Sequence, residues 1–326
     1  MKFVLPGGTG QLGQVLAAHW AGQGHEVTLL TRSPRGQNEL AWDGATLGPW
    51  ASALDGADVV VNLAGRSVNC RYIAKNLRDM LDSRVDSTRV VGEAIAAAKR
   101  PPRVWLQAST ATIYSHRHDA PNDDVSGVIG GDEPDVPISW GASVAIAKSW
   151  ERELFLADCT QTRRVALRAS VVLGPGQGSI YDVMATLAKR GLAGAAAGGR
   201  QFVSWIHERD FISALDFLIA DGSLDGAVNV CSPNPLPNRE FNGILRRSLG
   251  VRIGLPATRW MLEIGAAFMK TETELVLKSR RVVPTRLLGA GFTFDYPNWP
   301  DAAAALASEW KATPSLPASR PTPEAG

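Results

Sequence analysis

The chain has 326 residues, of which 45% are hydrophobic and 20% charged, and its formal net charge is +2. This composition is typical of a folded globular protein rather than a disordered one, and the length allows one large domain or two unequal lobes. The small net charge argues against a nucleic-acid partner and against attachment to a charged membrane surface.

Cysteine use and the amino terminus indicate a cytoplasmic protein. Cys70, Cys159 and Cys231 are far apart and form neither a CxxC pair nor a metal-ligand spacing, and sparse cysteines suit reduced thiols. The opening MKFVL stops at Pro6, so it does not resemble a secretory signal, and no stretch approaches the ~20 apolar residues of a membrane span. We expect a soluble, cytoplasmic protein that acts on a small molecule, without metal, nucleic acid or membrane, with a homodimer as a possible assembly.

The first half of the chain alternates strand and helix patterns. Strands are predicted at residues 2–5, 26–31, 58–63, 103–108 and 164–173, and helices at 11–23, 77–99, 144–157 and 210–220. This alternation predicts a parallel sheet covered by helices on both faces. Right-handed crossovers make it a Rossmann-type, doubly wound α/β fold.

The texture changes after residue 227, where three prolines cluster and two helical stretches follow, at 238–249 and 258–277. We assign residues 1–175, with 205–230 returning to it, to an NADP-binding Rossmann domain. Residues 176–204 and 231–312 then form a smaller substrate lobe. The proline-rich end, residues 313–326, is unable to bury much surface and is predicted to be disordered.

A glycine-rich stretch, GGTGQLG, joins the first strand to the first helix. Gly7, Gly10 and Gly13 recur at intervals of three. A helix that begins directly after a glycine turn presents free N–H groups and a partial positive charge, which suit a pyrophosphate. The spacing GxxGxxG differs from the commoner GxGxxG, so a plain strand-to-helix turn is the alternative.

The end of the second strand favours one cofactor over another. Dinucleotide-binding folds often carry an acid there for a ribose hydroxyl, or an arginine for a 2′-phosphate. This chain reads LLTRSPR, with Arg32 at that point, Arg35 nearby and no acid. A guanidinium binds phosphate through paired hydrogen bonds, so NADP is favoured over NAD. The alternative is a solvated basic loop, which is the better explanation for Arg35 alone.

Two further features point to the same crevice. The stretch NLAG, residues 62–65, ends a strand and would let the adenosine half of a cofactor lie across the strand ends; a tight turn at Gly65 is the alternative. Arg84 interrupts the buried face of the long helix, where a guanidinium is costly unless it is paired or faces an anion. It either points towards the cofactor crevice, with Asp79 a little over one turn before it, or snorkels to the surface.

GGTGQLG, Arg32, NLAG, SRVDST and SWIHERD occur in this order, and with them the chain resembles the extended short-chain dehydrogenase/reductase superfamily. It is most similar to the atypical epimerase-like subfamily with a C-terminal domain of unknown function, through GGRQFVSWIHERD (198–210) and RRVVPTRLLGAGFTFDYP (280–297). The resemblance implies a Rossmann fold that binds NADP. The cofactor contacts predicted from the motifs and this resemblance are Gly7, Thr9, Gly10, Gln11, Leu12, Gly13, Thr31, Arg32, Leu63, Ala64, Gly65, Asp79, Arg84, Ser109 and Val171.

The resemblance also implies a catalytic Ser or Thr, a Tyr that exchanges a proton with the substrate oxygen, and a Lys four residues after the Tyr. Ser109 and Thr110 end the strand VWLQAST, where the hydroxyl is expected, and Lys148 lies on the next helix. Val144, not Tyr, stands four residues before Lys148. The subfamily pattern has a Trp-Glu pair instead, here Trp150-Glu151, so Lys148 matches either by role or by accident.

Another group would have to replace the missing proton donor. The chain has four tyrosines, Tyr72, Tyr114, Tyr181 and Tyr296. Tyr114 follows the serine and is our candidate over the cleft, although a wall position is the favoured alternative; Tyr181 could approach from the second lobe. His207 has the right unperturbed pKa, near ~6.5, but a histidine at a helix start is more often a structural anchor.

Two functions follow from these observations. The first is an NADP-dependent oxidoreductase or epimerase, in which Ser109 and Thr110 orient the substrate oxygen and Tyr114 or a water delivers the proton. The second is a non-catalytic NADP(H)-binding sensor or scaffold, which the missing Tyr favours. The sequence names neither the substrate nor the direction of the reaction.

Overall fold

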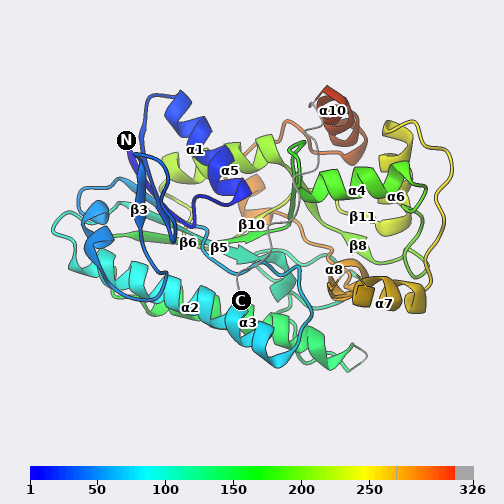
Figure 1. The fold of residues 1–326 in the computed structure, drawn as a ribbon, viewed down its shortest axis with the longest axis horizontal. Helices are drawn as coiled ribbons and strands as arrows, with labels where there is room; N and C mark the ends of the chain where they lie inside the picture. Colours follow the sequence, from blue (N-terminus) through cyan, green and yellow to red (C-terminus); the bar gives the residue numbers. More distant parts are fainter. Residues whose placement is uncertain (135, 269, 313–326) are drawn as a thin grey trace.

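The structure is a computed structural model that describes residues 1–134, 136–268 and 270–312. The tail predicted at 313–326 lies outside the described residues. One lobe surrounds a large sheet, and a second lobe holds shorter strands and several helices (Figure 1).

The large sheet has seven strands. They are β1 (Lys2–Pro6), β2 (Glu26–Thr31), β3 (Glu39–Ala41), β4 (Val59–Asn62), β5 (Val104–Thr110), β6 (Arg163–Ala169) and β10 (Gly226–Val230). Their order is β10-β6-β5-β4-β1-β2-β3, and every neighbouring pair is parallel. The order reverses between β1 and β4, which is where doubly wound sheets bind ligands. The predicted Rossmann-type fold is confirmed.

Helices cover both faces of the sheet. Helices α1 (Gln11–Gly22) and α5 (Glu208–Ala220) lie on one face, and α2 (Ala74–Ala97) and α3 (Ile138–Leu156) lie on the other (Figure 1). Strand side chains alternate between the two cores: Phe3 packs with the first pair of helices, and Val4 with the second. Both faces are therefore apolar, as expected of a buried parallel sheet.

The second lobe has a core of its own. Its elements are β7 (Val171–Leu173), β8 (Phe202–Val203), β9 (Trp205–His207), β11 (Leu236–Pro237), α4 (Ile180–Lys189), α6 (Asn238–Ser248), α7 (Arg259–Phe268), α8 (Glu274–Leu277) and α10 (Trp299–Ala312). Phe241 stacks on Trp299 with ring centroids 4.1 Å apart. A further helix, α9 (Thr285–Gly289), places Leu287 in the core of the large sheet. The residue boundaries assigned to the two lobes stay a prediction.

Two predicted elements are divided in the structure. The strand predicted at 164–173 is β6 in the large sheet followed by β7, which pairs with β9. The Ser170 amide still donates to the Val230 carbonyl of β10, so the chain leaves the large sheet after Ser170. The helix predicted at 258–277 is two helices, α7 and α8. Strands β3 and β10 were not predicted, because both are short and neither shows a clear strand pattern.

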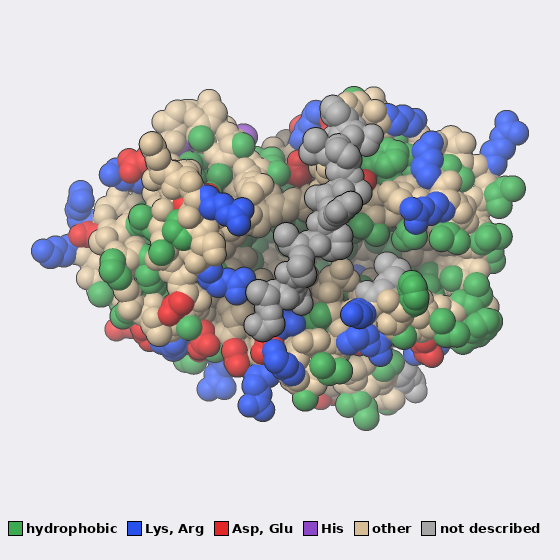
Figure 2. Space-filling view, in the orientation of Figure 1, with side chains coloured by type: hydrophobic (Ala, Val, Ile, Leu, Met, Phe, Trp, Pro, Cys, Tyr) green, Lys and Arg blue, Asp and Glu red, His purple; other side chains and the backbone are tan. Residues whose placement is uncertain are grey.

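The second lobe exposes hydrophobic side chains on the face seen in Figure 2. Figure 2 shows hydrophobic side chains gathered over it, and on α7 the residues Trp260, Ile264 and Phe268 are exposed. No helix within the described ranges is long and apolar enough to cross a bilayer.

Candidate active site

The glycine loop contacts the loop after β4 through backbone atoms. Gly7 has φ +72°, and a Cβ at this position would lie 2.8 Å from the backbone N and Cα of Ala64. The Gly7 amide also donates to the Leu30 carbonyl at 3.0 Å, which ties the loop to the end of β2. Only glycine permits this conformation and this approach without strain.

The other two glycines have different surroundings. A Cβ on Gly13 would lie 2.4 Å from the Gly8 carbonyl oxygen, so Gly13 lets α1 pack directly on the loop. A Cβ on Gly10 would meet only the Gly7 carbonyl oxygen, at 3.5 Å. Gly10 is exposed, no side chain caps α1, and its first turn carries no acid. The N-terminus of α1 is therefore open to an anionic group, which a plain turn does not require.

Several residues predicted to contact the cofactor lie beside this opening. Gln11 is exposed at the first position of α1 and faces Gly176 of the second lobe, whose Cβ would lie 3.6 Å from the Gln11 Nε2. Leu12 packs against the core of the sheet. The Thr9 and Thr31 hydroxyls are 3.2 Å apart, so they join the glycine loop to the end of β2.

Arg32 follows Thr31 and is exposed beside the glycine loop. Within the described part of the chain, no carboxylate forms an ion pair with Arg32. Arg35 lies further along, where its backbone amide donates to Glu39 Oε2 at 2.6 Å. Arg32 is therefore an unpaired arginine that directly follows Thr31, whose hydroxyl contacts Thr9 of the glycine loop.

Arg84 lies against the carboxyl end of β4. Its Cζ would be 3.3 Å from a Cβ on Gly65, and it lies 4.9 Å from the ring centroid of Trp150. Burial lowers the pKa of Arg84, and its Nη1 donates to the Met80 carbonyl at 3.0 Å. No carboxylate pairs with it among the described residues. This half-buried, uncompensated cation favours the crevice over a snorkelling side chain.

Asp79 and the NLAG stretch shape the wall of the crevice. Asp79 of α2 pairs with Lys75 on the same helix and with Arg66, and the pair with Arg66 holds the loop after β4 on α2. Asn62 accepts the Ala64 amide at 3.0 Å and donates to Gln107 Oε1 at 3.0 Å. Leu63 and Ala64 are half-buried and Gly65 is exposed, so this segment presents its backbone to the crevice.

Ser109 belongs to a buried hydrogen-bond network. Its hydroxyl donates to Glu151 Oε1 at 2.6 Å. Arg168 donates to both Glu151 oxygens, at 2.8 and 2.7 Å, and to the Tyr114 hydroxyl at 2.9 Å. Tyr114 donates in turn to Asn229 Oδ1 at 2.9 Å. Tyr114 is 2% exposed and burial raises its pKa to about 12, which favours the wall position.

Other predicted groups are held apart from this network. Thr110 is half-buried, and its Oγ1 accepts the Thr112 amide at 3.1 Å. Lys148 is exposed, with its Nζ 3.5 Å from the position of a Cβ on Gly131. Val171 begins β7 and pairs with Trp205. Helix α3 therefore meets Ser109 through Glu151 and not through Lys148.

His207 and Tyr181 lie in the second lobe. His207 Nδ1 accepts the Arg209 amide at 3.1 Å and so caps α5, and burial lowers the pKa of His207 to about 4. Its ring stacks on Tyr296 at 4.1 Å. Tyr181 is fully buried and burial raises its pKa. These contacts favour the structural alternative for His207, and the burial of Tyr181 places its side chain inside the second lobe.

The two lobes meet beyond β5 through a polar group of residues that the sequence analysis did not predict. Lys278 Nζ donates to the Thr112 carbonyl at 2.8 Å, and Arg280 Nε donates to Thr112 Oγ1 at 3.1 Å. Glu274 lies 3.7 Å from Lys278 and accepts the Ser143 hydroxyl at 2.5 Å. We name Thr112, Ser143, Glu274, Lys278 and Arg280 the inter-lobe cluster. The available sequence signal was that Arg280 begins the stretch RRVVPTRLLGAGFTFDYP and Lys278 stands two residues before it.

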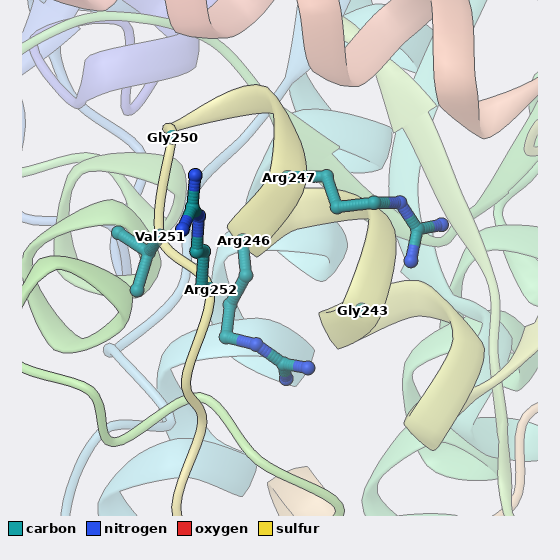
Figure 3. Close-up of a pocket in the computed structure, with 6 residues that line it drawn as sticks. All are labelled: Gly243, Arg246, Arg247, Gly250, Val251 and Arg252. Atoms are coloured by element: carbon teal, nitrogen blue, oxygen red, sulfur yellow. The ribbon is translucent and has the colours of Figure 1, made fainter.

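A separate pocket of about 550 Å³ lies at the end of α6. Its lining residues are Gly243, Arg246, Arg247, Gly250, Val251 and Arg252 (Figure 3). The three guanidinium groups point in different directions in Figure 3, and Arg246 donates to the Ala193 carbonyl. Cations are stabilised by the free carbonyls at a helix C-terminus, so these arginines need no ligand.

Models of known protein families match most of the chain. Residues 3–231 match the NAD dependent epimerase/dehydratase family, and residues 257–306 match a domain of unknown function, DUF1731. Epimerase family protein SDR39U1 of Bos taurus is 32% identical over 303 residues, which cover 91% of this chain and 96% of that protein. Epimerase family protein YfhF of Bacillus subtilis is 30% identical and covers 95% of this chain and 99% of its own length.

A solved structure is also similar. Human epimerase family protein SDR39U1 (isoform 2), crystallised with NADPH, superposes with a TM-score of 0.83 at 28% identity. The match covers 94% of this chain and 99% of that one.

Proposed function

The chain belongs to the NAD dependent epimerase/dehydratase family of extended short-chain dehydrogenases/reductases, and from this membership we propose that it is an NADP(H)-dependent oxidoreductase or epimerase. The observation that supports NADP(H) as the cofactor is the open N-terminus of α1 at the glycine loop. Gly7 and Gly13 are required by packing, whereas Gly10 leaves the N-terminus of α1 free beside the unpaired Arg32. The NADPH in the human relative supports the same choice.

The residues present fit a phosphorylated dinucleotide. The first-turn amides of α1 would hold the pyrophosphate, and Arg32, with the Thr31 hydroxyl beside it, would hold the 2′-phosphate. Ala64 and Gly65 would lie under the adenosine half, and Arg84 would supply a second cation at the end of β4. The cofactor, when bound, supplies hydride transfer to or from a carbon of the substrate.

The reacting end of the site lies at the carboxyl end of β5. Thr110 is half-buried there, with the Ser109 hydroxyl engaged by Glu151. We propose that the Thr110 hydroxyl orients the substrate oxygen directly and that Ser109 keeps α3 in place through Glu151. Lys148 is exposed, and Val144 stands four residues before it, so α3 offers no tyrosine as its partner.

The alternative function is a non-catalytic NADP(H)-binding sensor or scaffold. It is supported by the internal hydrogen bonds of Ser109 and Tyr114 and by Val144 at the position where a tyrosine was expected. Titration with NADPH and NADH, followed by nicotinamide fluorescence, tests cofactor binding. A panel of carbonyl compounds and sugar nucleotides then separates the two functions: turnover that Ser109→Ala or Thr110→Val abolishes supports the enzyme, and tight binding without turnover supports the sensor.

Three further expectations stay predictions: a cytoplasmic location, a small-molecule substrate and a homodimer. The apolar face of α7, with Phe268 89% exposed, supports an assembly with a second copy. Light scattering of the purified chain and of Phe268→Glu would test the assembly, because the charged variant would shift a dimer towards monomer.

A further inference from the structure

Thr110 lies at the junction of β5 and a short 3-10 turn, η2 (Ala111–Ile113). Its Oγ1 accepts the Thr112 amide at 3.1 Å and so caps the turn. In the described part of the chain the Thr110 hydroxyl donates to no protein acceptor, whereas the neighbouring Ser109 hydroxyl donates to Glu151. The Thr110 hydroxyl hydrogen is therefore free for a substrate oxygen, and its direction depends on where the Thr112 amide lies.

Two cations from the C-terminal region contact Thr112. Lys278 Nζ donates to the Thr112 carbonyl at 2.8 Å, and Arg280 Nε donates to Thr112 Oγ1 at 3.1 Å. With the bond from its amide to Thr110, the amide, the carbonyl and the side chain of Thr112 are all engaged. Both cations lie within residues 257–306, the domain of unknown function. A segment that is distant in sequence thus fixes the turn that follows β5.

The same C-terminal segment is attached to the β5 side by other contacts. The Ser279 amide donates to His116 Nδ1 at 2.8 Å, and the Ser279 hydroxyl donates to the Arg117 carbonyl at 2.9 Å. The Asn122 amide donates to the Arg281 carbonyl at 2.7 Å. Because these contacts flank the two cations, joining the lobes does not require the cations themselves.

The charges of the inter-lobe cluster are kept at a cost in stability. The Lys278 and Glu274 side chains are 2% and 1% exposed, and Lys278 Nζ lies 3.7 Å from Glu274 Oε1. Among the described residues this carboxylate oxygen has no hydrogen-bond partner, and burial lowers the pKa of Lys278 to about 8. Apolar side chains often pack such an interface as well as a buried ion pair or better. Stability alone therefore does not explain a charged residue at position 278.

The inference from these contacts rests on the proposed function. We propose that Lys278 and Arg280 are positioning residues, which act through Thr112 to aim the Thr110 hydroxyl at the substrate oxygen. The hydroxyl donates a hydrogen bond to this oxygen as hydride transfer places negative charge on it. The C-terminal region contributes to the reaction through this contact, without touching the substrate.

The first test needs neither nucleotide nor substrate. Lys278→Met alone leaves the buried Glu274 carboxylate without its counter-charge, so the test protein is the neutral-pair variant, Lys278→Met with Glu274→Gln. In this variant the Thr112 amide, followed by NMR, should exchange its hydrogen at least about 10-fold faster than in the native chain. Lys189→Met is the matched control, because Lys189 Nζ also donates to a carbonyl, that of Leu249 at 2.9 Å, elsewhere in the second lobe. It should leave the exchange unchanged.

Two results of this test would overturn the proposal. One is unchanged exchange of the Thr112 amide in the neutral-pair variant. The other is faster exchange of the Thr112 amide and of the Val60 amide in β4 by equal factors, because the amide of a buried central strand reports unfolding of the whole chain.

The second test uses NADPH and phenanthrenequinone as the carbonyl probe. The neutral-pair variant should lower kcat by about 10–100-fold and leave the Kd for NADPH unchanged, because small misplacements of a reacting group are costly. In a Thr110→Val background the same substitutions should lower kcat by less than about 2-fold, since no hydroxyl is left to aim. Equal factors in the two backgrounds would reveal a merely structural role and contradict the proposal.

A second variant covers the case in which the neutral-pair variant does not fold. Thr112→Val keeps both charges and removes only the hydroxyl that accepts Arg280. It should lower kcat by a smaller factor, and again only while the Thr110 hydroxyl is present. A native chain that neither binds NADPH nor reduces the quinone would remove the proposed function and with it the catalytic role of the cluster. The amide exchange would still decide whether Lys278 fixes the turn.

Discussion

The two ends of the site are built from different groups. At the β1–β4 end the backbone shapes the crevice, and Arg32 and Arg84 lie there without a carboxylate partner in the described residues. At the β5 end side chains fill the space, and the cations Arg168 and Lys278 each lie beside a carboxylate. Uncompensated positive charge suits a polyanionic cofactor, whereas paired charges leave little net charge for a substrate to match.

This difference suggests that substitutions will affect the two ends in opposite ways. At the β1–β4 end, where the backbone shapes the crevice, we expect a substitution to weaken ligand binding while the fold survives. At the β5 end we expect a substitution to destabilise the fold first, because the side chains that fill this end also join strands, helices and lobes.

The largest effect is expected from Glu151→Gln. This change leaves the Arg168 guanidinium, whose side chain is 14% exposed, without its counter-charge, which should cost about 3–5 kcal/mol of the free energy of unfolding. Urea denaturation measures it. Glu93→Gln removes the exposed pair with Arg89 and is the matched control, with an expected cost below about 1 kcal/mol. Equal costs for both variants would break the comparison.

The next largest effect is expected at low pH, which should destabilise the fold at the β5 end of the site. His116 Nδ1 accepts the Ser279 amide at 2.8 Å across the lobes. Burial, and then the charges of His118 and Lys278, lower the pKa of His116 to about 4. The unfolded chain takes up this proton near ~6.5 and the folded chain only near 4, so stability present above pH ~6.5 is lost as the pH falls towards 4.

We expect this loss to be about 2 kcal/mol, measured by urea denaturation at several pH values. His116→Asn should flatten the dependence in this window, and His118→Gln should keep it. A native chain with the same stability at pH 4.5 and 7 would contradict the role of His116.

Two glycine substitutions in the glycine loop test the β1–β4 end of the site. Gly7→Ala places a methyl group 2.8 Å from the Ala64 backbone at a positive φ, with an expected strain of about 1–3 kcal/mol. Gly10→Ala meets only an ordinary contact at 3.5 Å, so stability should hold. Both variants should lose NADPH affinity, which fluorescence titration measures. Normal NADPH binding by Gly10→Ala would show that no phosphate approaches this turn.

Lys148→Ala should have the smallest effect. The side chain is exposed, so we expect the free energy of unfolding to change by less than about 0.5 kcal/mol and the Kd for NADPH to stay the same. Loss of phenanthrenequinone reduction in this variant, with stability intact, would reinstate Lys148 as a functional residue.

The sequence predicted the part of the molecule that contiguous motifs encode. The sheet, the glycine loop and the position of Arg32 follow from local patterns, because strand, turn and helix are neighbours in the chain. The inter-lobe cluster joins Thr112, Ser143 and Lys278, which are far apart in sequence, and no local pattern brings them together. Likewise, Ser109 looked like a free hydroxyl, since its bond to Glu151 depends on how α3 packs on β5.

The most direct test of the central claim, that the glycine loop and Arg32 hold a phosphorylated dinucleotide, is the ratio of Kd values for NADPH and NADH in Arg32→Asp, with Arg35→Asp as the matched control. Loss of a charge-assisted contact costs about 1.5–3 kcal/mol, so NADPH affinity should fall by about 10–100-fold while NADH affinity is unchanged, and Arg35→Asp should alter the ratio far less. Equal losses for both nucleotides, or no loss for either, would contradict it.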